Sequence, residues 1–122
     1  FSSRRRHTRL LPVTGVLTCA LPILARFMFF NGLSRTKKNG PIDYLYNPYI
    51  EDNLALTLQL KLLCDQYYPG LSRNIYLKSL RYNLHLSDKA LLIEVGAQTN
   101  TLQEILNTME PLSVLLAKVF GV

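Results

Sequence analysis

Residues 90–104 read Ala-Leu-Leu-Ile-Glu-Val-Gly-Ala-Gln-Thr-Asn-Thr-Leu-Gln-Glu, and this stretch decides the expected fold. Its apolar run, residues 91–95, predicts a buried strand of an α/β sheet, although the run contains one carboxylate, Glu94. A glycine turn follows, and Thr101-x-x-Glu104 is the signature of a capping box that opens a helix. Folds of this class place chemistry at strand ends, so Glu94 is the leading candidate for a functional group. The alternative is a solvated glutamate on an edge strand, and the pattern alone does not separate the two.

The patterns on either side of this stretch predict a short alternation of strands and helices. Residues 26–31 and 75–77 are brief apolar and aromatic runs that predict strands. Residues 50–68 predict a helix because they exceed the length of a typical strand, although their alternating leucines would also suit one. The last helix is expected to kink or restart at Pro111. Its predicted core-facing stripe is Leu102, Ile105, Leu106, Met109, Leu112, Leu116 and Val119.

Length and charge restrict the class of protein. The chain has 122 residues, which is room for one domain, and a formal net charge of +6. Four arginines and no acid fall in residues 1–25, and the rest of the chain holds ten basic and eight acidic residues. Because no basic stripe interleaved with aromatic residues remains, nucleic acid is not an expected partner. Cys19 and Cys64 lie far apart, in no metal-ligand spacing.

The beginning of the chain calls for a separate interpretation. Read as protein, a basic cluster followed by an interrupted apolar run imitates a signal peptide or a short anchor. Residues 3–9 and 13–23, however, both resemble the translation of a common short-read sequencing adaptor in one frame, with a single mismatch at Leu17. We therefore expect residues 1–24 to be a non-native segment. Residues 25–122 are then expected to be a partial catalytic domain that lacks what lay upstream.

Few other residues offer chemistry. His85 is the single histidine outside residues 1–24, and catalytic zinc needs about three protein ligands, so we interpret it as a surface or hydrogen-bonding residue. Arg73 and Arg81 flank the strand predicted around Tyr76 and are candidates for contacting an anionic or polar substrate. The alternative for both is an ordinary surface arginine. The sequence has no G-x-S-x-G nucleophile elbow and no glycine-rich phosphate loop.

An ordered set of motifs is similar to a known family. The motifs are YYPGLSR at 67–73, RYN-x-x-LS at 81–87, LLIEVG at 91–96 and NTL-x-E at 100–104. In this order they resemble the C-terminal half of the stage II sporulation protein P family, over residues 26–120. The resemblance implies part of an amidase-like, three-layer α/β fold, a sheet flanked by helices, with about three short strands and two main helices here.

The resemblance also implies a function. It suggests a zinc-dependent N-acetylmuramoyl-L-alanine amidase-like hydrolase that degrades peptidoglycan during engulfment, and endopeptidase activity is associated with the family as well. The protein would act outside the cytoplasm, anchored to the cell membrane through a segment missing here. Stage II sporulation proteins D and M are the implied partners. The alternative function is a small membrane-anchored or wall-binding interaction protein without catalysis.

The residues that carry this chemistry follow from the same resemblance. More distant amidases have a similar strand end, apolar-Glu-apolar-Gly followed by an asparagine, in which the glutamate is the catalytic acid/base. Glu94 takes that position here, and Asn100 is expected to orient the loop that follows and is, like Arg73 and Arg81, a candidate for binding substrate. The zinc ligands of the full-length protein would lie upstream, so no metal ligand is assigned in this chain. As written, the chain is expected neither to bind catalytic zinc tightly nor to hydrolyse peptidoglycan.

Overall fold

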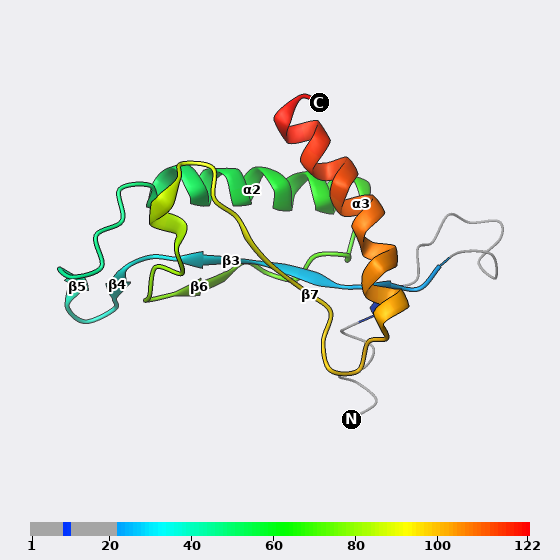
Figure 1. Cartoon of the computed structure of the whole chain (residues 1–122), viewed down its shortest axis with the longest axis horizontal. Helices are drawn as coiled ribbons and strands as arrows, with labels where there is room; N and C mark the ends of the chain where they lie inside the picture. Colours follow the sequence, from blue (N-terminus) through cyan, green and yellow to red (C-terminus); the bar gives the residue numbers. More distant parts are fainter. Residues whose placement is uncertain (1–8, 11–21) are drawn as a thin grey trace.

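A three-stranded sheet lies at the centre of the computed structural model, which describes residues 9–10 and 22–122 (Figure 1). The middle strand is β3 (Phe27–Gly32). On one side β6 (Tyr76–Lys78) runs parallel to it, and on the other side β7 (Leu92–Val95) runs antiparallel. These are the three strands that the apolar runs predicted.

Two helices accompany the sheet, also as predicted. Helix α2 spans Ile50–Tyr67, with two acidic residues in its first turn that suit the positive end of the helix dipole. Helix α3 spans Leu102–Phe120 and begins with the predicted capping box. Its N-cap Thr101 hydroxyl accepts from the Glu104 N–H (3.2 Å), and the Glu104 carboxylate accepts from the Thr101 N–H (3.1 Å). The mixed α/β class is therefore confirmed.

Shorter elements connect these parts. A single 3-10 turn, η2 (Leu84–Leu86), lies between β6 and β7. Two small antiparallel pairs complete the described elements, namely β1 (Arg9–Leu10) with β2 (Leu24–Ala25), and β4 (Arg35–Thr36) with β5 (Gly40–Pro41). Residues 1–8 and 11–21 lie outside the described residues, so the adaptor-like origin of residues 1–24 stays a prediction.

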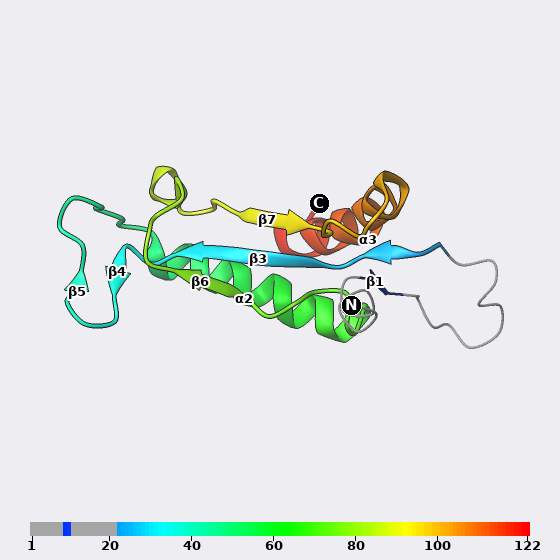
Figure 2. The same cartoon turned by 90° about the horizontal axis from the view of Figure 1, so that it is seen from below.

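Both helices pack on one face of the sheet. Phe27 and Phe29, whose rings meet edge to face at 5.2 Å, are fully buried against them. The helices contribute Leu56, Leu60, Cys64, Leu112 and Leu115 to this cluster. Alternate residues of β3, Met28 and Phe30, point to the opposite face, and within the described ranges no helix covers it (Figure 2). We call this second surface the helix-free face; the described part thus accounts for two of the three expected layers.

The position of Glu94 corrects one prediction. Within the described part of the chain, β7 is an edge strand rather than a buried one. Ile93 and Val95 are half-buried against the core, whereas Leu92 and Glu94 are exposed. The apolar run predicted burial on both faces, but helices cover only one face here. Glu94 is therefore a solvated glutamate on an edge strand, which was the alternative interpretation.

The buried face of α3 also differs from the predicted stripe. Leu102 is 71% exposed, and Leu106 and Met109 are exposed as well. Leu112 of the stripe is buried as predicted, and Leu116 and Val119 pack against the core. The other residues that the helix buries are Glu104, Thr108, Pro111 and Leu115. Hydrogen bonds explain the choice of face, because the Thr108 hydroxyl donates to the Ala25 carbonyl (2.7 Å) and Glu104 closes the capping box. The expected restart at Pro111 is wrong, since α3 continues through it.

Helix α2 buries a polar side as well. Its buried residues are Asn53, Leu56, Thr57, Leu60 and Cys64, while Leu58 and Leu62 of the leucine pattern face solvent. Both helices thus hold apolar side chains that the described residues leave exposed. Among the described residues, neither helix has the length and apolar character needed to span a membrane.

Candidate functional site

Glu94 sits one residue before the end of β7, with its side chain on the helix-free face. It lies opposite Met28 in the antiparallel ladder, so the two side chains share that face. The ladder closes just beyond it, where the Gly96 N–H donates to the Arg26 carbonyl (2.7 Å). Gly96 has a φ of 82°, a left-handed conformation that favours glycine and lets the chain turn away here. The carboxylate is thus held at a strand end beside a loop.

Two arginines share this end of the sheet with Glu94. Ser72 pairs with Phe27 in a parallel bridge, and the Arg73 N–H donates to the Phe27 carbonyl (2.7 Å). Because side chains alternate along a strand, Arg73 and Arg26 both project toward the helix-free face. Burial, and next the nearby charge of Arg73, lower the pKa of the Arg26 guanidinium.

The arrangement places a carboxylate and two guanidinium groups on one surface. A carboxylate can accept or donate a proton, and arginine offers paired N–H donors that match carboxylate groups. Sequence reasoning selected Glu94 and Arg73 but missed Arg26. The sequence marks Arg26 only by its position just before an apolar strand. The pairing of β3 with β7 is needed to show which face of the sheet its side chain occupies.

Asn100 fixes the loop that follows Glu94. Its Oδ1 accepts from the Ala97 N–H (2.8 Å), and its Nδ2 donates to the Glu104 carboxylate (2.9 Å). Glu104 is only 6% exposed and belongs to the first turn of α3. Asn100 therefore links the turn after β7 to the capping box. Its side chain is engaged in holding the loop.

Arg81 lies at the other end of β3. Its Nη1 donates to the Tyr46 carbonyl (3.2 Å), and its backbone lies against Gly32, where an added Cβ would collide with the Leu80 carbonyl oxygen and the Arg81 backbone. Met28, opposite Glu94, is four residues away from Gly32 along the strand, which corresponds to about 13 Å. The structure therefore places Arg73 and Glu94 at one end of the sheet, on opposite sides of β3, and Arg81 at the other end.

A group of aromatic rings occupies the helix-free face between these ends. The Phe30 ring centroid lies 4.7 Å from that of Tyr76 and 4.9 Å from that of Tyr82. Tyr82 reaches this position with a left-handed φ of 50°, which is uncommon for a bulky residue. The Lys78 ammonium lies 4.7 Å from the Tyr76 ring centroid, and a hydrogen bond with Tyr76 raises the pKa of Lys78. Sequence patterns give no sign of this group, because it depends on the turn at Tyr82.

Comparison with known proteins adds to this geometry. Residues 23–120 match the family model described as stage II sporulation protein P. The chain belongs to the stage II sporulation protein P family. Over 60 residues it is 37% identical to stage II sporulation protein P of Bacillus subtilis (strain 168), an alignment that covers 45% of this chain and 15% of that relative. No solved structure matches the chain.

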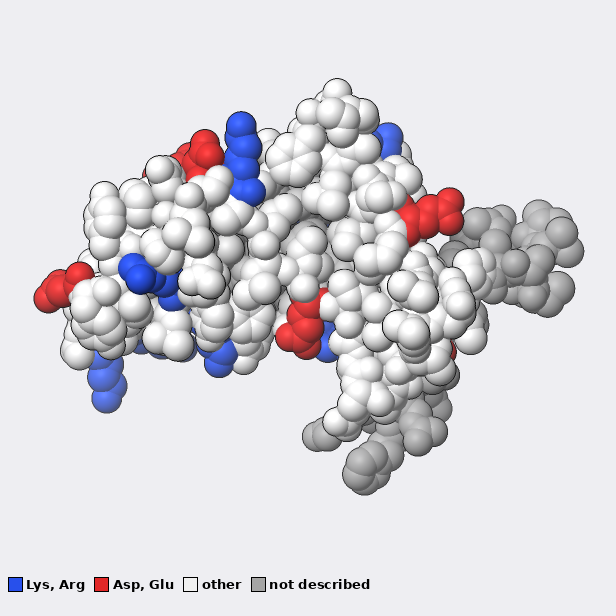
Figure 3. Space-filling model, viewed as in Figure 1, with Lys and Arg blue, Asp and Glu red and all other residues white. Residues whose placement is uncertain are grey.

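The described part of this sporulation protein does not offer a metal site. Among residues 9–10 and 22–122, no three or more His, Cys, Asp or Glu side chains cluster in a way that could hold an ion. His85 lies in η2, is half-buried and belongs to no such cluster among these residues. Basic and acidic side chains are interspersed singly on the surface drawn in Figure 3. These residues therefore do not by themselves form a zinc centre, and the upstream zinc ligands that the resemblance implied stay a prediction.

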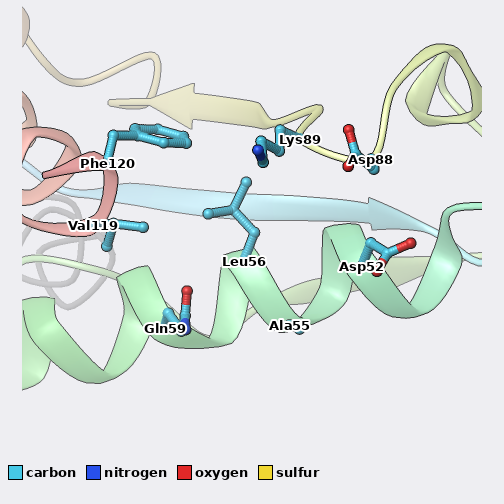
Figure 4. A pocket seen from close by; sticks show the side chains of 8 residues that line it. All are labelled: Asp52, Ala55, Leu56, Gln59, Asp88, Lys89, Val119 and Phe120. Atoms are coloured by element: carbon cyan, nitrogen blue, oxygen red, sulfur yellow. The ribbon is translucent and has the colours of Figure 1, made fainter.

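A cavity of about 400 Å³ lies on the helix side of the sheet, away from Glu94. It opens between α2, the end of α3 and residues 88–89. Phe120 and Val119 close one end, and Asp52 and Asp88 line the other (Figure 4). The cavity shares no residue with the surface that carries Glu94, so the two are separate features.

Proposed function

We propose that Glu94 is the general acid/base of an N-acetylmuramoyl-L-alanine amidase that cleaves peptidoglycan during engulfment, with endopeptidase activity as a second reaction. The observation that carries this proposal is the exposed carboxylate at the end of β7, at the same end of the sheet as Arg26 and Arg73 and ahead of a loop fixed by Asn100. An acid/base must be accessible to substrate and yet rigidly held. Glu94 is exposed, and its backbone is held by the ladder with β3 and by the hydrogen bond at Gly96.

The chemistry assigns a role to each group. The Glu94 carboxylate would accept a proton from the water that attacks the amide carbonyl and return it to the departing amine. The guanidinium groups of Arg26 and Arg73 present paired N–H donors, which suit the free carboxylates of a peptidoglycan stem peptide. The loop held by Asn100 keeps the strand end in place during both transfers.

Other parts of the protein would complete this function. The described residues do not hold a zinc-ligand set, so no step is assigned to a metal here. We propose that the zinc of the natural protein is held by residues outside those described, and that an anchoring segment outside them places it on the outer side of the cell membrane. Stage II sporulation proteins D and M are its proposed partners.

The test of this function replaces one atom at Glu94. In the natural protein that contains residues 25–122, Glu94→Gln should lower the release of soluble fragments from purified peptidoglycan by about 100-fold or more. Glu110→Gln is the matched control, because Glu110 is an exposed glutamate on α3. Unchanged release by Glu94→Gln would show that the carboxylate is not the acid/base.

A wall-binding module without catalysis is the second candidate. The aromatic group at Phe30, Tyr76 and Tyr82 favours it, because flat exposed rings beside a lysine suit the stacking of sugar rings. Tyr76→Ala should then reduce co-sedimentation with peptidoglycan, whereas Tyr44→Ala, an exposed tyrosine elsewhere, should not. This function requires loss of binding in Tyr76→Ala together with undiminished turnover in Glu94→Gln.

A further inference from the structure

Asn53 is a buried amide that has no role in the chemistry proposed above. It lies in the first turn of α2 and is 1% exposed. Its Nδ2 donates to the carbonyl oxygens of Leu84 (2.6 Å) and Ser87 (3.0 Å), and its Oδ1 accepts from the Ala90 N–H (2.9 Å). All three partners belong to the connection between β6 and β7. A buried amide bonded three times to one distant segment holds that segment in place.

The connection is otherwise largely exposed. Leu84 is buried, but Leu86 is 72% exposed, and residues 87–89 all face solvent. Its backbone hydrogen bonds are local, from the Leu84 N–H to Arg81 and from the Leu86 N–H to Asn83. Arg81 fixes the start of the connection through its contacts at Tyr46 and Gly32. Asn53 fixes its end, directly before β7.

The end of this connection sets the register of β7. Residues 91–95 are apolar except for Glu94. Their pattern therefore only weakly specifies whether residues 91, 93 and 95 or residues 92 and 94 should face the helices. A slip of one residue would turn Glu94 from the helix-free face toward Phe27 and Phe29. The Ala90 hydrogen bond defines where the strand begins, and the Gly96 hydrogen bond defines where it ends.

We infer that Asn53 is a positioning residue for Glu94. By holding the Ala90 backbone against α2, its amide makes β7 start in the register that keeps Glu94 on the helix-free face. The consequence for activity rests on the proposed function. The consequence for the order of β7 does not, so the two can fail separately.

The test uses a nearly isosteric substitution. Asn53→Asp keeps an oxygen for the Ala90 N–H but replaces the amide donors with a carboxylate oxygen that faces the Leu84 and Ser87 carbonyl oxygens. Thr57→Ser is the control, because Thr57 is as deeply buried and lies one turn further along α2. Amide hydrogen exchange of both variants is measured in the natural protein at neutral pH, by mass spectrometry.

We expect exchange across residues 90–95 to accelerate about 10- to 100-fold in Asn53→Asp, because a buried polar group loses its partners. Exchange in α3, which reports unfolding of the whole unit, should change much less. Thr57→Ser should leave residues 90–95 as in the wild type. If Asn53→Asp leaves their exchange unchanged, Asn53 does not hold β7. Should this variant not fold, Asn53→Ser, which retains one donor, is subjected to the same comparison.

Kinetics test whether the anchor serves Glu94. In Asn53→Asp, kcat should fall about tenfold or more while KM stays within about twofold, since misplacement of an acid/base affects the chemical step. If Asn53→Asp shows faster exchange in β7 but a normal kcat, and Glu94→Gln is inactive, Asn53 does not position Glu94. If Glu94→Gln is fully active, the proposed function fails, and the exchange experiment alone decides whether Asn53 anchors β7.

Discussion

The two faces of the central sheet differ in what they contribute to the molecule. On the helix side Phe27 and Phe29 are completely buried among leucines of α2 and α3. On the helix-free face Met28 and Phe30 are half-buried, and Glu94 is exposed. Neighbouring residues of a single strand thus belong to different environments. The comparison teaches that one face provides the packing energy, while the other leaves charged groups accessible.

The largest expected effect compares two adjacent phenylalanines. Phe29→Ala should lower the free energy of unfolding by about 3–5 kcal/mol, because it removes a fully buried ring and leaves a cavity. Phe30→Ala should cost clearly less, since its ring is half-buried and packs mainly on Tyr76 and Tyr82. Urea denaturation of both variants measures the difference. Equal losses would mean that the helix-free face is packed as tightly as the helix side.

A smaller effect is expected where the loop after Glu94 joins the helix side. Asn100→Asp would place a carboxylate 2.9 Å from the Glu104 carboxylate oxygen, in place of an amide donor. The loss of this bond at a largely buried partner should lower the free energy of unfolding by about 1–3 kcal/mol. Denaturation at pH 7 measures it, with Asn39→Asp in the exposed β4–β5 turn as the control. A variant as stable as wild type would show that this loop is fixed by other contacts.

The titration of Cys64 measures how well the core on the helix side excludes water. Burial raises the pKa of its thiol, so the folded state favours the protonated form. The corresponding stability is present below the pKa of an unfolded thiol, about 8.5, and is lost as pH rises through the folded value. The protein with Cys64 should therefore lose more stability than Cys64→Ala between neutral and alkaline pH. Parallel pH profiles would contradict a buried thiol.

The smallest expected effect on stability is at Glu94. Because its side chain is exposed, Glu94→Gln should change the free energy of unfolding by no more than about 0.5 kcal/mol. The same substitution is expected to abolish most activity. A clear gain or loss of stability in urea denaturation would show that the carboxylate has a structural role on the helix-free face.

The elements of this fold were predictable, but their orientation was not. Runs of apolar residues located β3, β6 and β7, and the capping box located the start of α3. The face that each helix buries depends on hydrogen bonds between distant segments, such as Thr108 to Ala25 and Asn53 to Ala90. The periodic pattern of apolar residues in the sequence does not predict such hydrogen bonds. The stripe through Leu102 and Leu106 was wrong for this reason.

The candidate site shows the same limit. Glu94 and Arg73 were selected from local motifs, and the structure places them at one end of the sheet. The position of Arg26 at this end of the sheet and that of Arg81 at the other end could not be predicted. Both positions depend on contacts between segments that are far apart in the sequence. Residue type and motif identify candidate groups, whereas topology decides which of them meet.

The pairing of β3 has a consequence for how the protein is made. Phe27 pairs with Val95, and Phe30 pairs with Tyr76, so both partner strands are synthesised long after β3. Four consecutive apolar residues, 27–30, therefore leave the ribosome without their hydrogen-bonding partners. Unpaired strands of this composition are prone to aggregate, and contacts distant in sequence form slowly. We therefore expect β3 to be exposed to aggregation until residue 95 has emerged.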